Sequence, residues 1–212
     1  MHISAMSTDL GRIITLPKTG DETFHSANMP MACTLKDFWK WSVSDLVSNA
    51  TRGRLAEFIV AQALEIPAGA VRDEWEAYDL KMPDGLKIQV KSAAYIQSWN
   101  QTKFSPITFS IRKSRFWDAA TNVLAVEPKH HADVYVFAVL AHKDKQTIDP
   151  LNVTQWEFYV MPIKAIEKYE RSKVSITLKS LERESGGPVN YSGLAVRVKS
   201  FMERIDDTDD GY

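Results

Sequence analysis

The feature that most restricts the fold is one long apolar run in the second half of the chain. From Ala132 to Ala141 every residue except Asp133 is apolar, and the run is rich in valine and aromatic residues. Residues of these types favour strands, and a strand without a polar face must be covered on both sides. We therefore expect a central buried strand with other elements packed on each face of its sheet.

The rest of the chain alternates between helical and strand patterns. Thr34 is placed to cap a helix that begins at Leu35, and Pro162 suits the first position of another. Helices are expected over residues 34–39, 51–65, 162–169 and 177–183, and strands over 75–82, 86–93, 107–111 and 156–161. The second helix is apolar nearly all round, which predicts burial on most sides. This order of elements predicts an α/β protein with a mixed central sheet flanked by helices.

The 212 residues fit one domain more easily than two. We expect a poorly ordered N-terminal arm over 1–33, a single domain over 34–200 and a solvated acidic tail over 201–212. One cysteine, Cys33, rules out a disulfide within the chain. No apolar run reaches the roughly 20 residues of a membrane span. These features predict a cytoplasmic protein with no membrane partner.

The overall charge narrows the function classes only slightly. The formal net charge is −1, whereas a protein that holds polyanions by charge alone is usually basic. The balance argues mildly against a passive nucleic-acid binder. An enzyme remains compatible with it, because a bound Mg²⁺ and a local basic patch can supply the positive field.

Glu57 is the first candidate site residue. In a helix its neighbours three and four residues away are apolar or glycine: Gly53, Val60, Ala61 and Leu64. Burying an unpaired carboxylate is expensive, so Glu57 needs a cation, a metal or a cap. A structural ion pair with an arginine is the alternative, although Arg54 is too close in sequence to be well placed.

The segment Pro83-Asp84-Gly85 predicts the register of a hairpin. In a three-residue loop proline suits the first position and glycine the left-handed third one, and Asp79 then lies directly opposite Gln89. Lys91, two residues further on, shares their face. A two-residue loop would send Asp79 to the other face. For Gln89 and Lys91 alone, plain solvent exposure is the alternative.

Together these residue types suit phosphodiester hydrolysis. Two carboxylates with an amide or backbone oxygen hold hard cations such as Mg²⁺, and we expect Glu57, Asp79, Gln89 and the carbonyl of Val90 to do so. The metal would polarise the phosphate and lower the pKa of an attacking water. Lys91 beside it can orient or deprotonate that water, or stabilise developing charge.

This set resembles the PD-(D/E)xK nuclease superfamily, whose pattern is a helical glutamate, a strand aspartate and then (D/E)xK on the next strand. Here it reads Arg52-Gly53-Arg54-Leu55-Ala56-Glu57, Tyr78-Asp79-Leu80 and Gln89-Val90-Lys91, within about residues 50–160. The stretch 89–99 also looks like a group of uncharacterised bacterial restriction-endonuclease-like proteins. Gln89 replaces the second acid, and Tyr78 replaces the usual proline.

The resemblance implies a restriction-endonuclease-like core and a Mg²⁺-dependent deoxyribonuclease, with Mn²⁺ able to substitute. A restriction or defence role follows from it, and a homodimer would suit double-strand cutting. RNA stays open as a substrate. Two other readings stay open: a nuclease-derived nucleic-acid-binding or interaction module that has lost catalysis, and an assembly protein that uses the polar hairpin face as an interface.

Substrate contacts are expected after the hairpin. Amides read base edges and basic groups hold phosphates, and both types cluster here: Gln97, Gln101, Lys103, Arg112, Lys113 and Arg115. The alternative is an ordinary polar loop followed by a solvated strand end.

Overall fold

A computed structural model describes residues 10–67, 71–118, 121–170 and 174–201. Its centre is a four-stranded sheet, in the order β3-β4-β8-β9. The strands are β3 (Leu80–Lys81), β4 (Lys87–Ala94), β8 (Val134–Leu140) and β9 (Trp156–Pro162). β4 and β8 run parallel, while the outer pairs are antiparallel. The predicted α/β class with a mixed central sheet is confirmed.

Strand β8 is the buried centre that its apolar run predicts. All seven of its residues are buried, and their side chains alternate between two hydrophobic clusters on opposite faces of the sheet. On one face Val134, Val136 and Ala138 pack with residues of α2 (Asn49–Ala63) and α5 (Tyr191–Lys199). The layer on this side therefore holds α2, the helix that carries Glu57.

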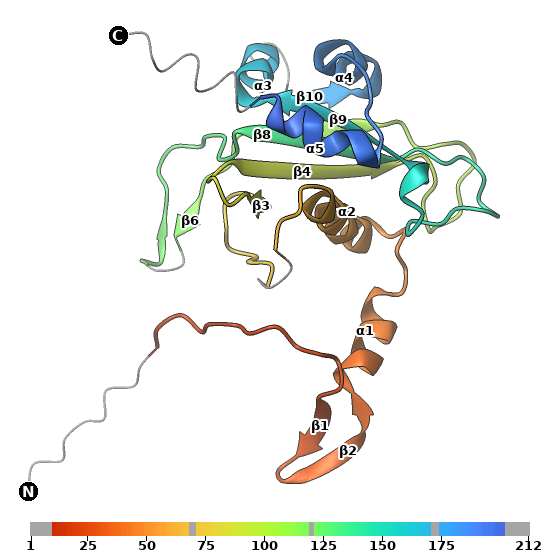
Figure 1. The fold of residues 1–212 in the computed structure, drawn as a ribbon. Coiled ribbons are helices and arrows are strands. Elements are labelled where there is room, and N and C mark those ends of the chain that lie inside the picture. The colour runs from red at the N-terminus through yellow and green to blue at the C-terminus, as the bar shows by residue number, and fades with distance from the viewer. Residues whose placement is uncertain (1–9, 68–70, 119–120, 171–173, 202–212) are drawn as a thin grey trace, which may run out of the picture.

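The opposite face is covered by a second layer. Here Tyr135, Phe137 and Val139 pack with residues of β5, β10, α3 and α4. These elements are β5 (Thr108–Ser110), β10 (Ser175–Thr177), α3 (Ile163–Glu170) and α4 (Leu178–Ser185). β5 and β10 form a small antiparallel pair. The sheet thus lies between two layers (Figure 1).

Local sequence signals explain most helix boundaries. Thr34 caps α1 (Leu35–Val43) in a capping box with Asp37, as predicted. α2 begins earlier than expected, with Ser48 rather than Thr51 at the N-cap position. The prediction that this helix is buried on most sides was wrong, because Phe58 is 58% exposed. α2 lies on the sheet with one face only.

An unexpected hairpin lies within the segment for which the sequence predicts a poorly ordered arm. β1 (Thr23–Ser26) and β2 (Met29–Thr34) pair antiparallel and, with α1, project from the body (Figure 1). Every residue of β1 is exposed. Because neither face of the strand is buried, the sequence shows no alternation of apolar and polar residues from which the strand could be predicted. The tail 202–212 lies outside the described residues, and the expected domain boundaries stay a prediction.

Two further strands, β6 (Trp117–Asp118) and β7 (Val123–Leu124), form a short ribbon, and η1 (Val153–Gln155) precedes β9. Strand β10 and helix α5 were not predicted. None of the helices described is both long enough and apolar enough to cross a membrane.

Candidate active site

The turn between β3 and β4 adopts the predicted register. Leu80 pairs with Ile88 and Lys81 with Lys87, and Gly85, at φ 98°, donates its N–H to the carbonyl of Met82 at 2.9 Å. A positive φ at this position favours glycine over every other residue. β3 is shorter than predicted and begins only at Leu80, so no strand among the described residues pairs with this edge of β4 beyond Ile88.

The carboxylate of Asp79 lies on that open edge. Its Oδ2 accepts a hydrogen bond of 2.7 Å from the backbone N–H of Val90 and another from Nε2 of Gln89. The Asp79 side chain is only 13% exposed. Burial, and then the negative charge of Glu57, raise the pKa of Asp79 to about 6, although the Val90 hydrogen bond, Arg72 and Lys91 act in the opposite direction.

Glu57 approaches Asp79 from α2. Its side chain is 13% exposed and binds Arg72, whose Nε contacts Oε2 and whose Nη2 lies 3.2 Å from Oε1. The same Nη2 lies 3.8 Å from Oδ1 of Asp79. The structure therefore contains the arginine ion pair that the sequence left as an alternative. The partner is Arg72, and its guanidinium joins Glu57 to Asp79.

Lys91 lies on β4 on the same face as Gln89, two residues away. Burial lowers the pKa of its amine, while the charge of Asp79 acts to raise it. Within the described part of the chain its Nζ makes no hydrogen bond or ion pair. A half-buried amine with a lowered pKa and no fixed partner is suited to exchanging a proton.

The backbone of Val90 contributes to the same edge. The N–H and C=O of one strand residue point toward the same neighbour, and the N–H of Val90 points to Asp79. The carbonyl of Val90 therefore also faces the open side of β4. Side chains of Glu57, Asp79 and Gln89 and this carbonyl supply oxygen atoms from three segments of the chain.

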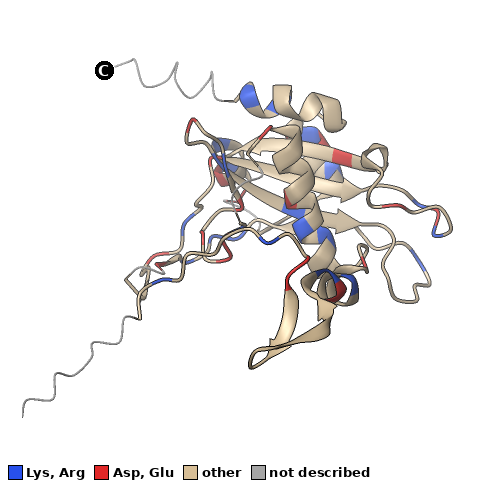
Figure 2. Cartoon of the chain, turned by 60° about the horizontal axis from the view of Figure 1, so that its bottom comes forward, with Lys and Arg blue, Asp and Glu red and all other residues tan. Residues whose placement is uncertain are grey.

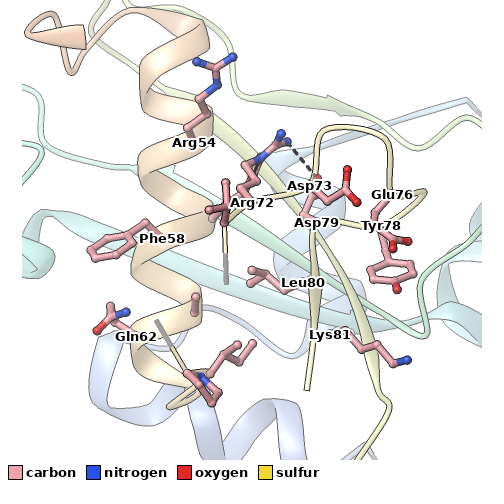
Figure 3. A pocket seen from close by; sticks show the side chains of 15 residues that line it. Arg54, Phe58, Gln62, Arg72, Asp73, Glu76, Tyr78, Asp79, Leu80 and Lys81 are labelled. Atoms are coloured by element: carbon pink, nitrogen blue, oxygen red, sulfur yellow. Dashed lines mark hydrogen bonds and ion pairs between the residues drawn. The ribbon is translucent and has the colours of Figure 1, made fainter. Parts of the chain in front are cut away.

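A cavity of about 500 Å³ opens between α2 and the segment that leads into β3. Glu57, Asp79 and Arg72 lie in its wall, and Arg54, Phe58 and Tyr78 extend that wall on either side (Figure 3). The two carboxylates are thus accessible from solvent through a cleft that is large enough for a nucleotide-sized group.

The comparison with protein families identifies a nuclease family. A family model described as bacteriophage T4 endonuclease IV matches residues 31–179, which include α1, the whole central sheet and all four candidate residues. The chain belongs to the phage T4 endonuclease IV family. No curated protein matches the chain. As a member of an endonuclease family, the chain is a nuclease.

In this endonuclease-family chain, two of the predicted substrate contacts are occupied by its own structure. Gln97 is buried and donates to the carbonyl of Ala94 at 2.9 Å. Gln101 accepts from the Gln97 backbone at 2.7 Å and donates to the carbonyl of Tyr95 at 3.1 Å. Both amides hold the loop after β4 in shape, which leaves them poorly placed to read bases.

The basic residues predicted to hold phosphates are on the surface. Lys103, Arg112, Lys113 and Arg115 are all exposed, and Lys113 has an ion pair with Glu170 at 3.7 Å. Basic and acidic positions are interspersed in the view of Figure 2. Their contact with nucleic acid stays a prediction.

The sequence did not single out two arginines that shape the site of this nuclease. Arg72 lies in an irregular segment with no periodic pattern. Arg52, only 3% exposed, donates to the carbonyl of Val47 at 2.7 Å and to Ser92 Oγ at 3.3 Å. An arginine amid the apolar residues of a buried helix face was the available signal for Arg52.

Proposed function

We propose that this nuclease is a divalent-metal-dependent DNA endonuclease of the PD-(D/E)xK type, with Glu57, Asp79, Gln89 and Lys91 at its active site. The observation that carries the proposal is the position of Asp79. Its carboxylate is bonded to Gln89 and Val90 of β4 and is joined to Glu57 of α2 through one guanidinium. These contacts bring Glu57, Asp79 and Gln89 to one edge of the sheet, which supports the proposal.

The donor set fits a hard cation. Two carboxylates, the Oε1 of Gln89 and the carbonyl of Val90 are all oxygen ligands, which Mg²⁺ and Mn²⁺ prefer. The described residues contain no cluster of three or more His, Cys, Asp and Glu side chains, so neutral oxygens are needed to complete the shell. When bound, the cation would supply a positive charge that stabilises the phosphate in the transition state.

Lys91 has the properties of a general base that accepts a proton from the attacking water. In hydrolysis the water oxygen forms a bond to phosphorus, the bond to one sugar oxygen breaks, and that oxygen gains a proton. A neutral Lys91 amine would accept the proton that the attacking water loses. Its lowered pKa makes the neutral form more accessible than it is for a lysine in water.

The substrate assignment rests on family membership and on surface charge. The family's namesake is an endonuclease of bacteriophage T4. Exposed lysines and arginines on the surface of the chain would bind phosphates. The resemblance to restriction-endonuclease-like proteins extends the proposal to a restriction or defence role. A homodimer would bring two such sites to the two strands of a duplex.

The test is cleavage by the purified full-length chain of plasmid DNA, single-stranded circular DNA and RNA. Reactions contain Mg²⁺, Mn²⁺ or EDTA and use the wild type, Asp79→Asn, Lys91→Met and the control Lys179→Met, which changes an exposed lysine on α4. We expect metal-dependent DNA cleavage by the wild type and the control and its loss in both site variants, with circular dichroism unchanged. Undiminished cleavage by Asp79→Asn, or cleavage in EDTA, contradicts the proposal.

A further inference from the structure

The guanidinium of Arg72 contacts the two carboxylates that are the proposed metal ligands. Its Nη2 is 3.2 Å from an oxygen of Glu57 and 3.8 Å from an oxygen of Asp79, and its Nε contacts the second oxygen of Glu57. Figure 3 shows the side chain extending from the segment before β3 into the space between α2 and Asp79. One positive group therefore contacts both carboxylates.

We propose that Arg72 is an internal counter-ion that holds Glu57 and Asp79 together and is exchanged for the divalent cation when the metal binds. This inference rests on the proposed function, because it assigns the same two carboxylates to a metal. It adds a residue outside the motif and predicts that metal binding is a competition within the protein.

The contacts of Arg72 make such an exchange feasible. The Arg72 side chain is 40% exposed, whereas each carboxylate is 13% exposed. A partly exposed arginine that leaves an ion pair regains hydration and side-chain freedom, so its departure costs little. Two neighbouring buried carboxylates without any cation would repel each other and lack their solvent. The carboxylates therefore need a cation, while Arg72 does not need the carboxylates.

A metal would have to lie closer to both carboxylates than Nη2 of Arg72 does. Divalent cations bind carboxylate oxygens at about 2.0 to 2.6 Å, which is closer than either contact of Nη2. A bound ion and the guanidinium cannot occupy this space together, since both require the same oxygens.

The displaced side chain would remain at the cleft. Arg72 and Arg54 both line the cavity beside the carboxylates (Figure 3), and guanidinium groups bind phosphate oxygens in bidentate geometry. After exchange Arg72 would be free to bind a phosphate of the polynucleotide. The same residue would then protect the empty site and contact the substrate in the loaded one.

The test is isothermal calorimetry of Mn²⁺ binding to the EDTA-treated, dialysed full-length protein. The variants are Arg72→Gln, Arg72→Lys and Arg54→Gln. Arg54→Gln is the matched control because it removes the same charge from the same cavity wall, and Arg54 has no ion pair in the described part of the chain. We expect Arg72→Gln to bind Mn²⁺ about three- to tenfold more tightly than the wild type. Arg54→Gln is expected to stay within about twofold.

Thermal unfolding gives the second readout. Without metal, Arg72→Gln is expected to melt below the wild type, and saturating Mn²⁺ is expected to raise its melting temperature by more than that of the wild type. If Arg72→Gln does not fold without metal, Arg72→Lys, which keeps the charge but loses the two-sided contact, is expected to show a smaller gain in affinity.

The outcomes separate this inference from the function on which it rests. Equal or weaker Mn²⁺ binding by Arg72→Gln, with clear binding by the wild type, overturns the exchange and leaves the proposed metal site intact. Absence of Mn²⁺ binding in the wild type and in every variant overturns the metal site itself.

Discussion

The backbone N–H of Val90 donates a hydrogen bond of 2.7 Å to the carboxylate of Asp79. Asp79 thereby occupies the ladder position that a longer β3 would fill, and its charge is fixed at the open edge of β4. A carboxylate so placed is held by the fold itself rather than by a metal. The site is therefore largely organised before any cation binds, which reduces the ordering cost of binding.

The stability of the metal-free protein is expected to depend on the ionisation of Asp79. Its pKa is raised to about 6 in the folded chain from an ordinary value of 3.8. Between these values the folded state binds a proton that the unfolded state lacks, so the unfolding free energy falls as pH rises from about 4 to about 6. Above about pH 6 the unfolding free energy is lower than at pH 4 by about 3 kcal/mol, because Asp79 is then charged in the fold.

Asp79→Asn isolates this contribution, because the amide oxygen can still accept from Val90. In EDTA we expect the variant to be about 3 kcal/mol more stable than the wild type near pH 7.5 and equally stable near pH 4. Urea unfolding at both pH values measures the difference. A wild type that gains stability relative to Asp79→Asn as pH rises would show that the Asp79 pKa is lowered instead.

Replacing Gln89 with glutamate is expected to tighten metal binding. The change adds a negative ligand where the PD-(D/E)xK pattern has an acid, and ligand charge is a main determinant of affinity for hard cations. We expect Mn²⁺ affinity to rise about tenfold in calorimetry. The metal-free variant should be less stable, because a third carboxylate then adjoins Asp79 and the hydrogen bond from Gln89 is lost.

Gln62→Glu is the control for Gln89→Glu. Gln62 is exposed on α2 and lines the same cavity, so the variant adds equal charge without a contact to Asp79. Comparable gains in affinity in the two variants would mean that the general field of the cavity, and not residue 89 as a ligand, governs binding.

The sequence predicted the hairpin well because its turn chemistry is local. Gly85 requires a positive φ, and that requirement sets the loop length, the register and hence the face of Asp79. The buried strand β8 was equally predictable, because every one of its side chains is apolar. In both places neighbouring residues alone determine the structure.

Other parts of the site and fold depend on contacts between residues far apart in the sequence, which no local sequence pattern predicts. Arg72 pairs with Glu57 from 15 residues away, so its partner is determined by tertiary structure and not by a local sequence pattern. Gln97 and Gln101 resembled substrate contacts because a polar loop side chain that bonds its own backbone looks the same in sequence. Helix α5 was not predicted, and its exposed Val196 puts an apolar residue on the solvent side, which obscures the helical period of apolar positions.

Lys91 is expected to act as a proton acceptor rather than as a fixed charge. Lys91→Met should lower kcat/KM by about 10² to 10⁴, and Lys91→Arg should not restore it, because arginine stays protonated. The wild-type rate is expected to rise with pH up to the lowered pKa of the amine. A Lys91→Arg variant within about tenfold of the wild type would instead indicate electrostatic stabilisation.

The buried Arg52 is expected to stabilise the frame behind the active site. It donates to Val47, Asn49, Ser92 and Gln97 at 2.7 to 3.3 Å, and so joins the start of α2 to the end of β4 and the loop beyond. Among the described residues it has no ion pair, and burial lowers its pKa. Its hydrogen bonds, not a salt bridge, therefore account for its place in the interior.

Arg52→Met keeps most of the side-chain volume but leaves four acceptors without their donor. We expect a loss of about 2 to 4 kcal/mol in the unfolding free energy, measured by urea denaturation. Arg54→Met, two residues along the same helix but exposed, should change it by less than about 0.5 kcal/mol. Removing a buried charge also removes the free-energy cost of its desolvation. If Arg52→Met is as stable as the wild type, that cost equals the stabilisation from all four hydrogen bonds, and the prediction is wrong.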